Sequence, residues 1–329
     1  MKVLITGGAG YIGSTVASAC EDAGHTVVIL DDFSTGRREF VRGRLCYEGD
    51  VADPRVLDDV FTDHEIDAVV HCAARIVVPE SVADPIGYYE NNVAKTLELL
   101  KAMERNGIQR FLFSSSASIY GPDENFVVTE DSPLEPGSPY ARTKFMVELI
   151  LEDFTKASDI SVLSLRYFNP IGTDPQLRSG QQLEKPSHVL AKLLEAWVNK
   201  DTFTVTGVDW PTRDGSGIRD FIHVWDLAQA HVAALEGFDK ATRNGPYQVF
   251  NIGTGNGVTV KELAASFEEI SGDPLKITEG PPRPGDVAGV YTVSTKAHDV
   301  LGWEAKLTET EAVRDAIAWL PVRKEMLGY

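Results

Sequence analysis

The segment Lys2–Gly13, with the sequence KVLITGGAGYIG, decides the fold class of this chain. Its first five residues form a continuous run of the β type, and a helical pattern covers Tyr11–Ala23. Between them, Gly7, Gly10 and Gly13 allow a tight turn, close approach of the backbone to a ligand, and close packing of the helix on the sheet. This strand, turn and helix predict a diphosphate site at a helix N-terminus, where unpaired N–H groups and the helix dipole favour negative charge.

The next predicted strand, Thr26–Leu30, leads into an acidic pair. Asp31 stands at the spacing at which a carboxylate binds the ribose hydroxyls of a dinucleotide, and Asp32 lies beside it. Because a carboxylate repels a 2′-phosphate, this position favours NAD over NADP. Arg37 and Arg38 follow and would be able to accept a 2′-phosphate, but a solvated loop is the better interpretation.

Apolar strands alternate with helical patterns through the first half of the chain. Such runs are typical of a parallel sheet that is covered on both faces, and the right-handed crossover rule makes it a doubly wound α/β sheet of the Rossmann type. Further strands are expected at Arg44–Tyr47, Ile66–Cys72, Arg110–Phe113 and Ser161–Tyr167, and helices at Pro54–His64, Pro85–Arg105 and Tyr140–Thr155.

The texture of the sequence changes at Asn169-Pro170, and this change divides the chain. We expect residues 1–169 to form an NAD-binding Rossmann domain, with residues 219–252 returning to it. Residues 170–218 and 253–329 would form a smaller, mixed α/β substrate domain. A second glycine run at Gly253–Gly257 has no acidic residue at the required spacing, so we interpret it as a structural turn. Later elements are expected as helices at Ser187–Asn199, Phe221–Phe238 and Thr259–Ile270 and a strand at Tyr247–Ile252.

Tyr140 and Lys144 stand at positions i and i+4 of a predicted helix, so both side chains lie on one face. A free tyrosine has a pKa of about 10, and an ammonium one turn away favours its phenolate. The pair follows a strand that ends in Ser114-Ser115-Ser116, at the edge of the sheet where ligands bind. We therefore expect Tyr140 to take a proton from a substrate hydroxyl while hydride leaves the same carbon.

Charge and cysteine content limit the partners. With 31 basic and 49 acidic residues, the formal net charge is −18, and such a surface repels nucleic acid and anionic lipid. An anionic ligand would need local positive charge. Cys20, Cys46 and Cys72 form neither a disulfide framework nor a metal-binding pattern. No leader and no apolar run of membrane-spanning length is seen, so we expect a cytoplasmic protein without a metal.

These motifs resemble the extended short-chain dehydrogenase/reductases and, within them, the UDP-glucose (UDP-galactose) 4-epimerases. The likeness runs nearly from end to end. The resemblance implies an NAD-dependent isomerase that oxidises C4 of a UDP-hexose, in plain or N-acetyl form, to a 4-keto sugar and reduces it on the other face. NAD would stay bound between turnovers. Besides the glycine turn and the Tyr-Lys pair, the resemblance includes Glu80-Ser81-Val82, Tyr88–Val93, Ser114-Ser115-Ser116, Ser138-Pro139-Tyr140, Arg166–Pro170 and Asp214–Val224 (DGSGIRDFIHV).

By analogy with this family, individual residues receive roles. The residues that match catalytic groups are Ser116, Tyr140 and Lys144. Cofactor contacts are expected from Gly7, Gly10, Tyr11, Ile12, Gly13, Asp31, Asp32, Asp50, Val51, Asn91, Tyr140, Lys144 and Phe168. Substrate contacts are expected from Ser116, Tyr140, Asn169, Arg219, Arg283 and Val290. The two arginines would bind the substrate diphosphate and supply the local positive charge.

The chain departs from the family pattern at three places. Arg75 is the candidate substitute for a lysine that many of these epimerases carry where this chain has Ile76. The segment Gln181–Val189 has Pro186-Ser187-His188 in place of the usual Pro-Asn-Asn or Pro-Asn-Leu pattern that helps to hold uridine, which leaves the base open. Val290 stands where a bulky tyrosine restricts some members to plain hexoses, which implies room for an N-acetyl group, but a shift of one residue to Tyr291 would reverse that inference.

Other functions stay open at this point. An epimerase for another nucleotide sugar, such as a UDP-uronic acid, would share these motifs. A 4,6-dehydratase would need an extra carboxylate where this chain has Ser114–Ser118, and a non-catalytic NAD-binding regulator would not need Tyr140 and Lys144.

A homodimer is also expected, in which the helices Pro85–Arg105 and Tyr140–Thr155 pack against their copies. Apolar residues at Val93, Leu97 and Leu100 motivate this expectation, although they would equally suit contact with the sheet.

Overall fold

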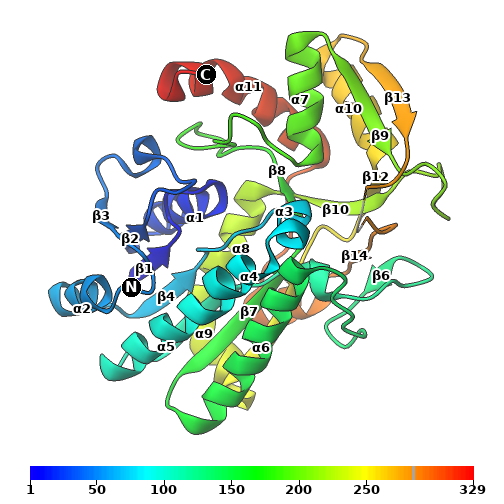
Figure 1. The fold of residues 1–329 in the computed structure, drawn as a ribbon. Coiled ribbons are helices and arrows are strands. Elements are labelled where there is room, and N and C mark those ends of the chain that lie inside the picture. Colours follow the sequence, from blue (N-terminus) through cyan, green and yellow to red (C-terminus); the bar gives the residue numbers. More distant parts are fainter. Residues whose placement is uncertain (284–285) are drawn as a thin grey trace.

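The computed structural model describes residues 1–283 and 286–329, and its centre is a seven-stranded sheet (Figure 1). The strand order is β11-β7-β5-β4-β1-β2-β3, and every neighbouring pair is parallel. Because the chain winds outward from β1 to both edges, the expected doubly wound fold is confirmed. The strands are β1 (Lys2–Thr6), β2 (Thr26–Asp31), β3 (Leu45–Glu48), β4 (Ala68–His71), β5 (Arg110–Ser114), β7 (Ser161–Tyr167) and β11 (Tyr247–Ile252).

Helices cover both faces of this sheet and divide its core in two. Val3 and Ile5 of β1 enter the core shared with α1 and α8, whereas Leu4 enters the core shared with α2, α5 and α6. This alternation follows from the pleat of a strand, and it explains why the central strands are apolar on both faces. The helices are α1 (Tyr11–Asp22), α2 (Pro54–Asp63), α5 (Lys95–Arg105), α6 (Pro139–Ala157) and α8 (Val224–Glu236).

The helix predicted over Pro85–Arg105 forms, but its pitch changes in the middle. α4 (Pro85–Tyr89) passes into a π-helical turn over Glu90–Ala94, and α5 continues from there. π-helical turns are rare in proteins, but those that occur are often found at functional sites. Asn91, one of the expected cofactor contacts, lies in this turn. The sequence did not predict the short helix α3 (Val78–Ala83) that precedes it.

The remaining elements form a smaller unit beyond the end of β7 (Figure 1). One small sheet has the order β12-β10-β8, and β9 pairs with β13 and β6 with β14. A separate apolar core, including Phe221 and Phe267, joins this unit to its helices. The elements are β6 (Val127–Val128), β8 (Asn169–Ile171), β9 (Thr202–Thr206), β10 (Ile218–His223), β12 (Gly257–Thr259), β13 (Lys276–Gly280), β14 (Tyr291–Thr292), α7 (Val189–Asn199), α10 (Val260–Ser271) and α11 (Glu309–Leu327). The short helix α9 (Phe238–Ala241) follows α8 and packs in the core of the large sheet instead.

The helix expected at Phe221–Phe238 is wrong at its start. β10 takes its first three residues, and α8 begins only at Val224. The reason is tertiary, because Phe221 pairs with Asn169 of β8 while Arg219 pairs with Val258 of β12. β10 thus lies in the small sheet, while α8 and β11 pack with the large one.

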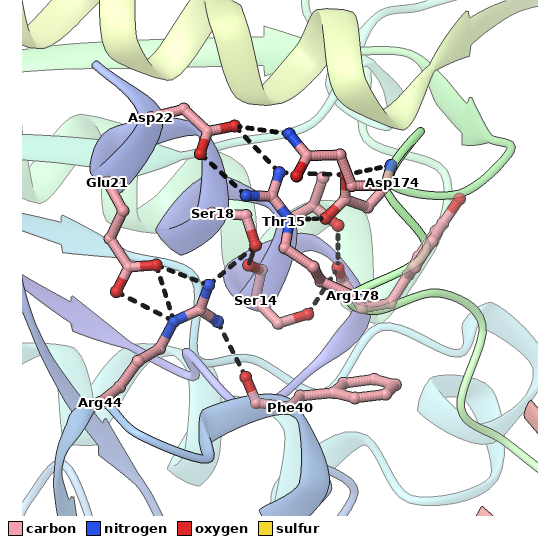
Figure 2. A network of polar contacts seen from close by, with 11 residues as sticks. Ser14, Thr15, Ser18, Glu21, Asp22, Phe40, Arg44, Asp174 and Arg178 are labelled. Atoms are coloured by element: carbon pink, nitrogen blue, oxygen red, sulfur yellow. Dashed lines mark hydrogen bonds and ion pairs between the residues drawn. The ribbon is translucent and has the colours of Figure 1, made fainter. Parts of the chain in front are cut away.

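Polar contacts fasten the chain after β8 to the first helix of the large sheet (Figure 2). Arg178 donates from Nη1 and Nη2 to the Asp22 carboxylate at 2.8 and 3.0 Å and from Nε to Asp174 at 2.5 Å. Nearer the start of α1, the Tyr11 hydroxyl donates to the Gly172 carbonyl at 2.7 Å. Both ends of α1 therefore hold the segment that leads from β8 towards α7.

Candidate active site

The glycine turn after β1 leaves no room for side chains. Gly7 has a φ of +71°, and a Cβ on it would lie 2.7 Å from the Ala73 amide nitrogen. A Cβ on Gly13 would overlap the carbonyl oxygen of Gly7, so the helix starts directly against the turn. Gly10 caps α1 without a side-chain hydrogen bond, which leaves the first N–H groups of the helix available, including those of Tyr11 and Ile12. These features fit a dinucleotide diphosphate.

Asp31 lies buried at the end of β2 and shapes the turn. Its carboxylate accepts hydrogen bonds from the amides of Ala9 at 2.9 Å and Phe33 at 2.8 Å. Burial raises the pKa of Asp31, and these two hydrogen bonds lower it. Neighbouring Asp32 accepts from the amide and hydroxyl of Ser34 instead. A buried acceptor thus occupies the position at which ribose hydroxyls are expected.

The two arginines after this strand already have partners. Arg38 pairs with Glu48 at 2.6 Å, and its guanidinium lies over the Phe33 ring. Arg37 donates from Nε to the Tyr329 hydroxyl at 2.9 Å. These contacts agree with the loop interpretation, since both arginines are engaged by groups of the protein itself.

The other expected cofactor residues follow the carboxyl ends of strands or lie in the π turn. Asp50 accepts from Lys95 Nζ at 2.5 Å, and Val51 packs against the core beside it. Asn91 donates from Nδ2 to Asn92 Oδ1 at 3.0 Å. Phe168 is buried directly after β7. They therefore lie along the edge of the sheet at which doubly wound folds bind ligands.

The predicted catalytic residues meet at the end of β5. Lys144 donates from Nζ to the Ser114 carbonyl at 2.7 Å, and this Nζ lies 4.9 Å from the centre of the Phe113 ring. Burial raises the pKa of Tyr140, and a hydrogen bond with Ser116 lowers it. Burial lowers the pKa of Lys144 to about 8. The structure thus brings Ser116, Tyr140 and Lys144 together, as the sequence predicts.

One electrostatic expectation is not met. Lys144 was expected to favour the phenolate of Tyr140, but the pKa of Tyr140 is raised, and Lys144 is not among the groups that shift it. The ammonium is held on the Ser114 carbonyl, and burial of the phenol outweighs the hydrogen bond with Ser116. Acidification of Tyr140 therefore needs a further positive charge near the phenol.

Sequence reasoning missed the polar groups behind these residues. The Ser114 hydroxyl contacts Cys72 Sγ at 3.2 Å and His231 Nε2 at 3.1 Å. Ser115 and Arg166 both contact the buried carboxylate of Glu148. The sequence did hold a signal for the ion pair of Glu148 and Arg166. Glu148 stands one turn after Lys144 on the predicted helix, and Arg166 interrupts the mainly apolar run Ser161–Tyr167.

The expected substrate residues approach from the small unit. The Arg219 guanidinium donates to the carbonyls of Ile218 and Ala288, each at 2.7 Å, and burial lowers its pKa. Arg283 also lowers the pKa of Arg219, so the two cations influence each other. Arg283 is exposed and pairs with Asp286 at 3.1 Å. Asn169 is exposed at the start of β8.

Val290 and Tyr291 contact different parts of the chain. Val290 packs against a cluster formed by Ala117, Phe168 and two neighbours. The Tyr291 ring lies beside Gly257 of β12, where a Cβ would be 2.5 Å from it.

The structure also shows which groups surround Arg75 and His188, at two of the places where the chain departs from the family pattern. Arg75 pairs with Asp84 at 2.8 Å and lies over the Tyr88 ring, while its neighbour Ile76 is exposed. His188 caps α7, stacks on Tyr11 with ring centroids 6.4 Å apart, and keeps a buried Nε2 that finds no protein partner among the described residues. His188 therefore sits beside the glycine turn rather than in a remote loop.

The sheet, the open glycine turn and the Ser-Tyr-Lys group define a dinucleotide-dependent enzyme. Across residues 1–283 and 286–329, no helix is long and apolar enough to cross a membrane, and no cluster of side chains suits a metal ion. A model of the NAD dependent epimerase/dehydratase family matches residues 3–253.

Individual relatives agree over the full length. UDP-glucose 4-epimerase of Azospirillum brasilense is 41% identical over 99% of this chain and 94% of its own length, and that of Bacillus subtilis is 40% identical over 97% and 96%. A solved UDP-glucose 4-epimerase of Stenotrophomonas maltophila, with NAD and formylated UDP-arabinopyranose bound, gives a TM-score of 0.94 at 34% identity over 99% of both chains. The UDP-Glc/GlcNAc 4-epimerase of Campylobacter jejuni gives 0.83 at 35% identity over 98% of this chain and 99% of that one. The chain belongs to the NAD dependent epimerase/dehydratase family.

Proposed function

We propose that this protein is an isomerase that interconverts UDP-glucose and UDP-galactose by NAD-dependent epimerisation at C4. The proposal rests mainly on one observation. Ser116, Tyr140 and Lys144 lie together at the carboxyl end of β5, at the same edge of the sheet as the glycine turn after β1. Three of the relatives reported above are named UDP-glucose 4-epimerase.

The residues divide the chemical work. NAD, held at the glycine turn and at Asp31, would supply the hydride acceptor and donor for C4 of the sugar. Tyr140 removes the proton of the 4-hydroxyl and later restores it, and the Ser116 hydroxyl stabilises the same oxygen by hydrogen bonding. The Lys144 ammonium lies one turn further along α6, where it donates to the Ser114 carbonyl. Because the 4-keto sugar must turn over between the two transfers, substrate binding energy has to come from the nucleotide rather than from the sugar.

Cofactor binding is proposed for the residues of the glycine turn and the strand ends. The diphosphate would lie against the start of α1, with the ribose at Asp31. Asp32, Asp50, Val51, Asn91 and Phe168 would complete the contacts along the edge of the sheet. On this proposal, residues 1–169 with the returning elements α8 and β11 bind the cofactor, and 170–218 and 253–329 bind the substrate.

Substrate binding is proposed for Arg219, Arg283 and Asn169. Arg219 has only carbonyl acceptors among the described residues, so a diphosphate would supply the negative charge that it lacks. Arg283 would exchange Asp286 for the same group. Val290 packs beside Phe168 and is smaller than the tyrosine that restricts some members of the family, which favours acceptance of N-acetyl sugars as well.

A homodimer in the cytoplasm is the proposed state. On α5 and α6, Leu97, Met146 and Leu149 are exposed apolar side chains. Of the three residues first expected at this interface, Leu100 is buried in the sheet core and Val93 packs against it. Sedimentation that shows only monomer at micromolar concentration would exclude the dimer.

The test is direct. The purified protein is incubated without added NAD with UDP-glucose, UDP-galactose, their N-acetyl forms and UDP-glucuronic acid, and the products are separated. We expect conversion of the hexoses, which requires NAD carried by the protein. The Tyr140→Phe variant should retain NAD and lose turnover by about 10²- to 10⁴-fold. Unchanged turnover in that variant, or conversion of the uronic acid alone, would contradict the proposal.

A further inference from the structure

A buried ion pair lies directly behind the catalytic residues and has no part in the mechanism above. Glu148 stands one turn after Lys144 on α6, and Arg166 lies on β7. Both side chains are buried, and Arg166 Nη2 contacts Glu148 Oε2 at 2.6 Å. Arg166 Nε adds contacts to both carboxylate oxygens at 3.0 and 3.1 Å.

The carboxylate also holds the strand end that carries the catalytic serine. The Ser115 hydroxyl, which is fully buried, donates to Glu148 Oε1 at 2.5 Å. On one side of it, the Ser114 carbonyl accepts from Lys144 Nζ at 2.7 Å, and on the other, Ser116 lies close enough to Tyr140 for its hydroxyl to lower the pKa of the phenol. Two consecutive residues of the strand end are therefore hydrogen-bonded to α6, and the third, Ser116, lies against Tyr140 of the same helix.

Arg166 is itself fixed from the opposite side. Its Nη1 donates to the Tyr120 hydroxyl at 2.9 Å and to the Glu130 carbonyl at 3.2 Å. The Tyr120 hydroxyl in turn donates to Asn251 Oδ1 at 2.6 Å, on the outermost strand of the sheet. The carboxylate of Glu148 is thus held in one position by groups from β7, β11 and the loop after β5.

A buried ion pair of this kind contributes little to stability compared with apolar packing, so its value lies elsewhere. Catalytic groups lose rate steeply when they are displaced, since a shift of about 1 Å costs about 100-fold. The contacts of Glu148 fix the distance between α6 and the strand end, which is the distance that sets Ser116 against Tyr140.

We propose that Glu148 is a positioning residue: held by Arg166, it fixes Ser115 and thereby the register of Ser116 and Ser114 against Tyr140 and Lys144. The kinetic consequences rest on the proposed function, whereas the consequences for the Tyr140 phenol do not.

The test removes one hydroxyl and leaves the ion pair in place. In Ser115→Ala, we expect kcat to fall by about 10- to 100-fold with KM and NAD content unchanged. The pH at which kcat reaches half its maximum should also rise, because the hydrogen bond from Ser116 that lowers the pKa of Tyr140 is weakened. Ser164→Ala is the matched control, since Ser164 is equally buried on β7 and makes no hydrogen bond with Glu148.

A spectroscopic readout separates the two proposals. Ultraviolet difference spectra between each protein and its own Tyr140→Phe counterpart report ionisation of this phenol alone. We expect its midpoint to lie at higher pH in Ser115→Ala and in Glu148→Gln than in the parent or in Ser164→Ala. If the parent does not interconvert UDP-hexoses, the proposed function fails but this measurement stands. An unmoved midpoint, or a loss of thermal stability with kcat unchanged, would overturn the positioning role.

Discussion

Two glycine-rich turns leave parallel strands of the same sheet, and only one of them is open to a ligand. Gly7–Gly13 follows β1, and Gly253–Gly257 follows β11. In the second turn the amides of Thr254 and Gly255 donate to the buried carboxylate of Asp220 at 2.8 and 3.2 Å. The protein's own side chain thus occupies the place that an external anion would take.

The helices that follow the two turns also differ in whether their first backbone N–H groups are bonded by side chains of the protein. α1 starts at Gly10 with no side-chain cap, whereas α10 starts with a capping box in which Thr259 and Glu262 satisfy each other's backbone amides. A run of glycines therefore does not define an anion site by itself. What matters is whether the backbone donors near it are already satisfied within the chain.

The largest effect is expected from a side chain in the open turn. In Gly13→Ala the new methyl group would collide with the Gly7 carbonyl. Overpacking of this kind costs about 1–3 kcal/mol and can be relieved only by displacing the turn, so NAD content and turnover should fall together. The measurement is chromatography of NAD released by denaturing the purified protein. Full retention of NAD would mean that the open turn is not the diphosphate site.

Lys144 is a buried cation at the same edge of the sheet as the open turn. Its burial predicts that the stability of the protein depends on pH. The folded-state pKa of Lys144 is about 8, below the ordinary value of 10.5, so the native state releases its proton first. The associated stability is fully present above pH 10.5 and is lost as the pH falls through 8. Relative to Lys144→Met, the parent should gain up to about 3 kcal/mol between these limits, as measured by denaturant unfolding. A constant difference across this range would contradict the shift.

A substitution that disturbs the second turn, Gly253–Gly257, should change stability and leave NAD binding unaffected; we call this the closed turn because Asp220 occupies its amides. Asp220→Asn removes the charge that accepts the turn amides, and we expect the free energy of unfolding to fall by about 1–3 kcal/mol. NAD content should equal that of the parent, because this turn binds no cofactor. Loss of NAD at unchanged stability would reverse the assignment of the two turns.

The smallest effect is expected from a methyl group in the closed turn. Gly255 has a φ of +84°, and a Cβ there would lie 3.6 Å from its nearest neighbour, the Thr292 carbonyl oxygen. Gly255→Ala should therefore cost only the strain of a left-handed backbone, about 1 kcal/mol, and lower the melting temperature by a few degrees. It is the matched control for Gly13→Ala, and a loss of NAD in it would weaken the comparison.

Much of this architecture is local and therefore visible in the sequence. The β1 turn, the strand Tyr247–Ile252 and the Tyr140–Lys144 pair depend on spacing within a few residues, and the structure has them as predicted. The start of β10 was misread because its strand character comes from partners that are about 40–50 residues away in the chain, near Asn169 and Val258.

Other features depend on contacts that no spacing reveals. The π turn around Asn91 breaks the regular period, and closure of the second glycine turn depends on Asp220, which lies more than 30 residues earlier. The raised pKa of Tyr140 follows from how deeply α6 packs, so the presence of Lys144 at i+4 could not predict it. Residue type and order showed which groups gather, but not the electrostatic balance among them.

The missing cap at the start of α1 has a consequence for the life of the protein in a cell. A helix whose first donors meet no side chain of the protein gains partners when a guest molecule binds there. Each bound nucleotide then stabilises the folded state by mass action. Newly made chains would compete for the pyridine-nucleotide supply, and scarcity would appear first as shorter-lived protein rather than as slower chemistry.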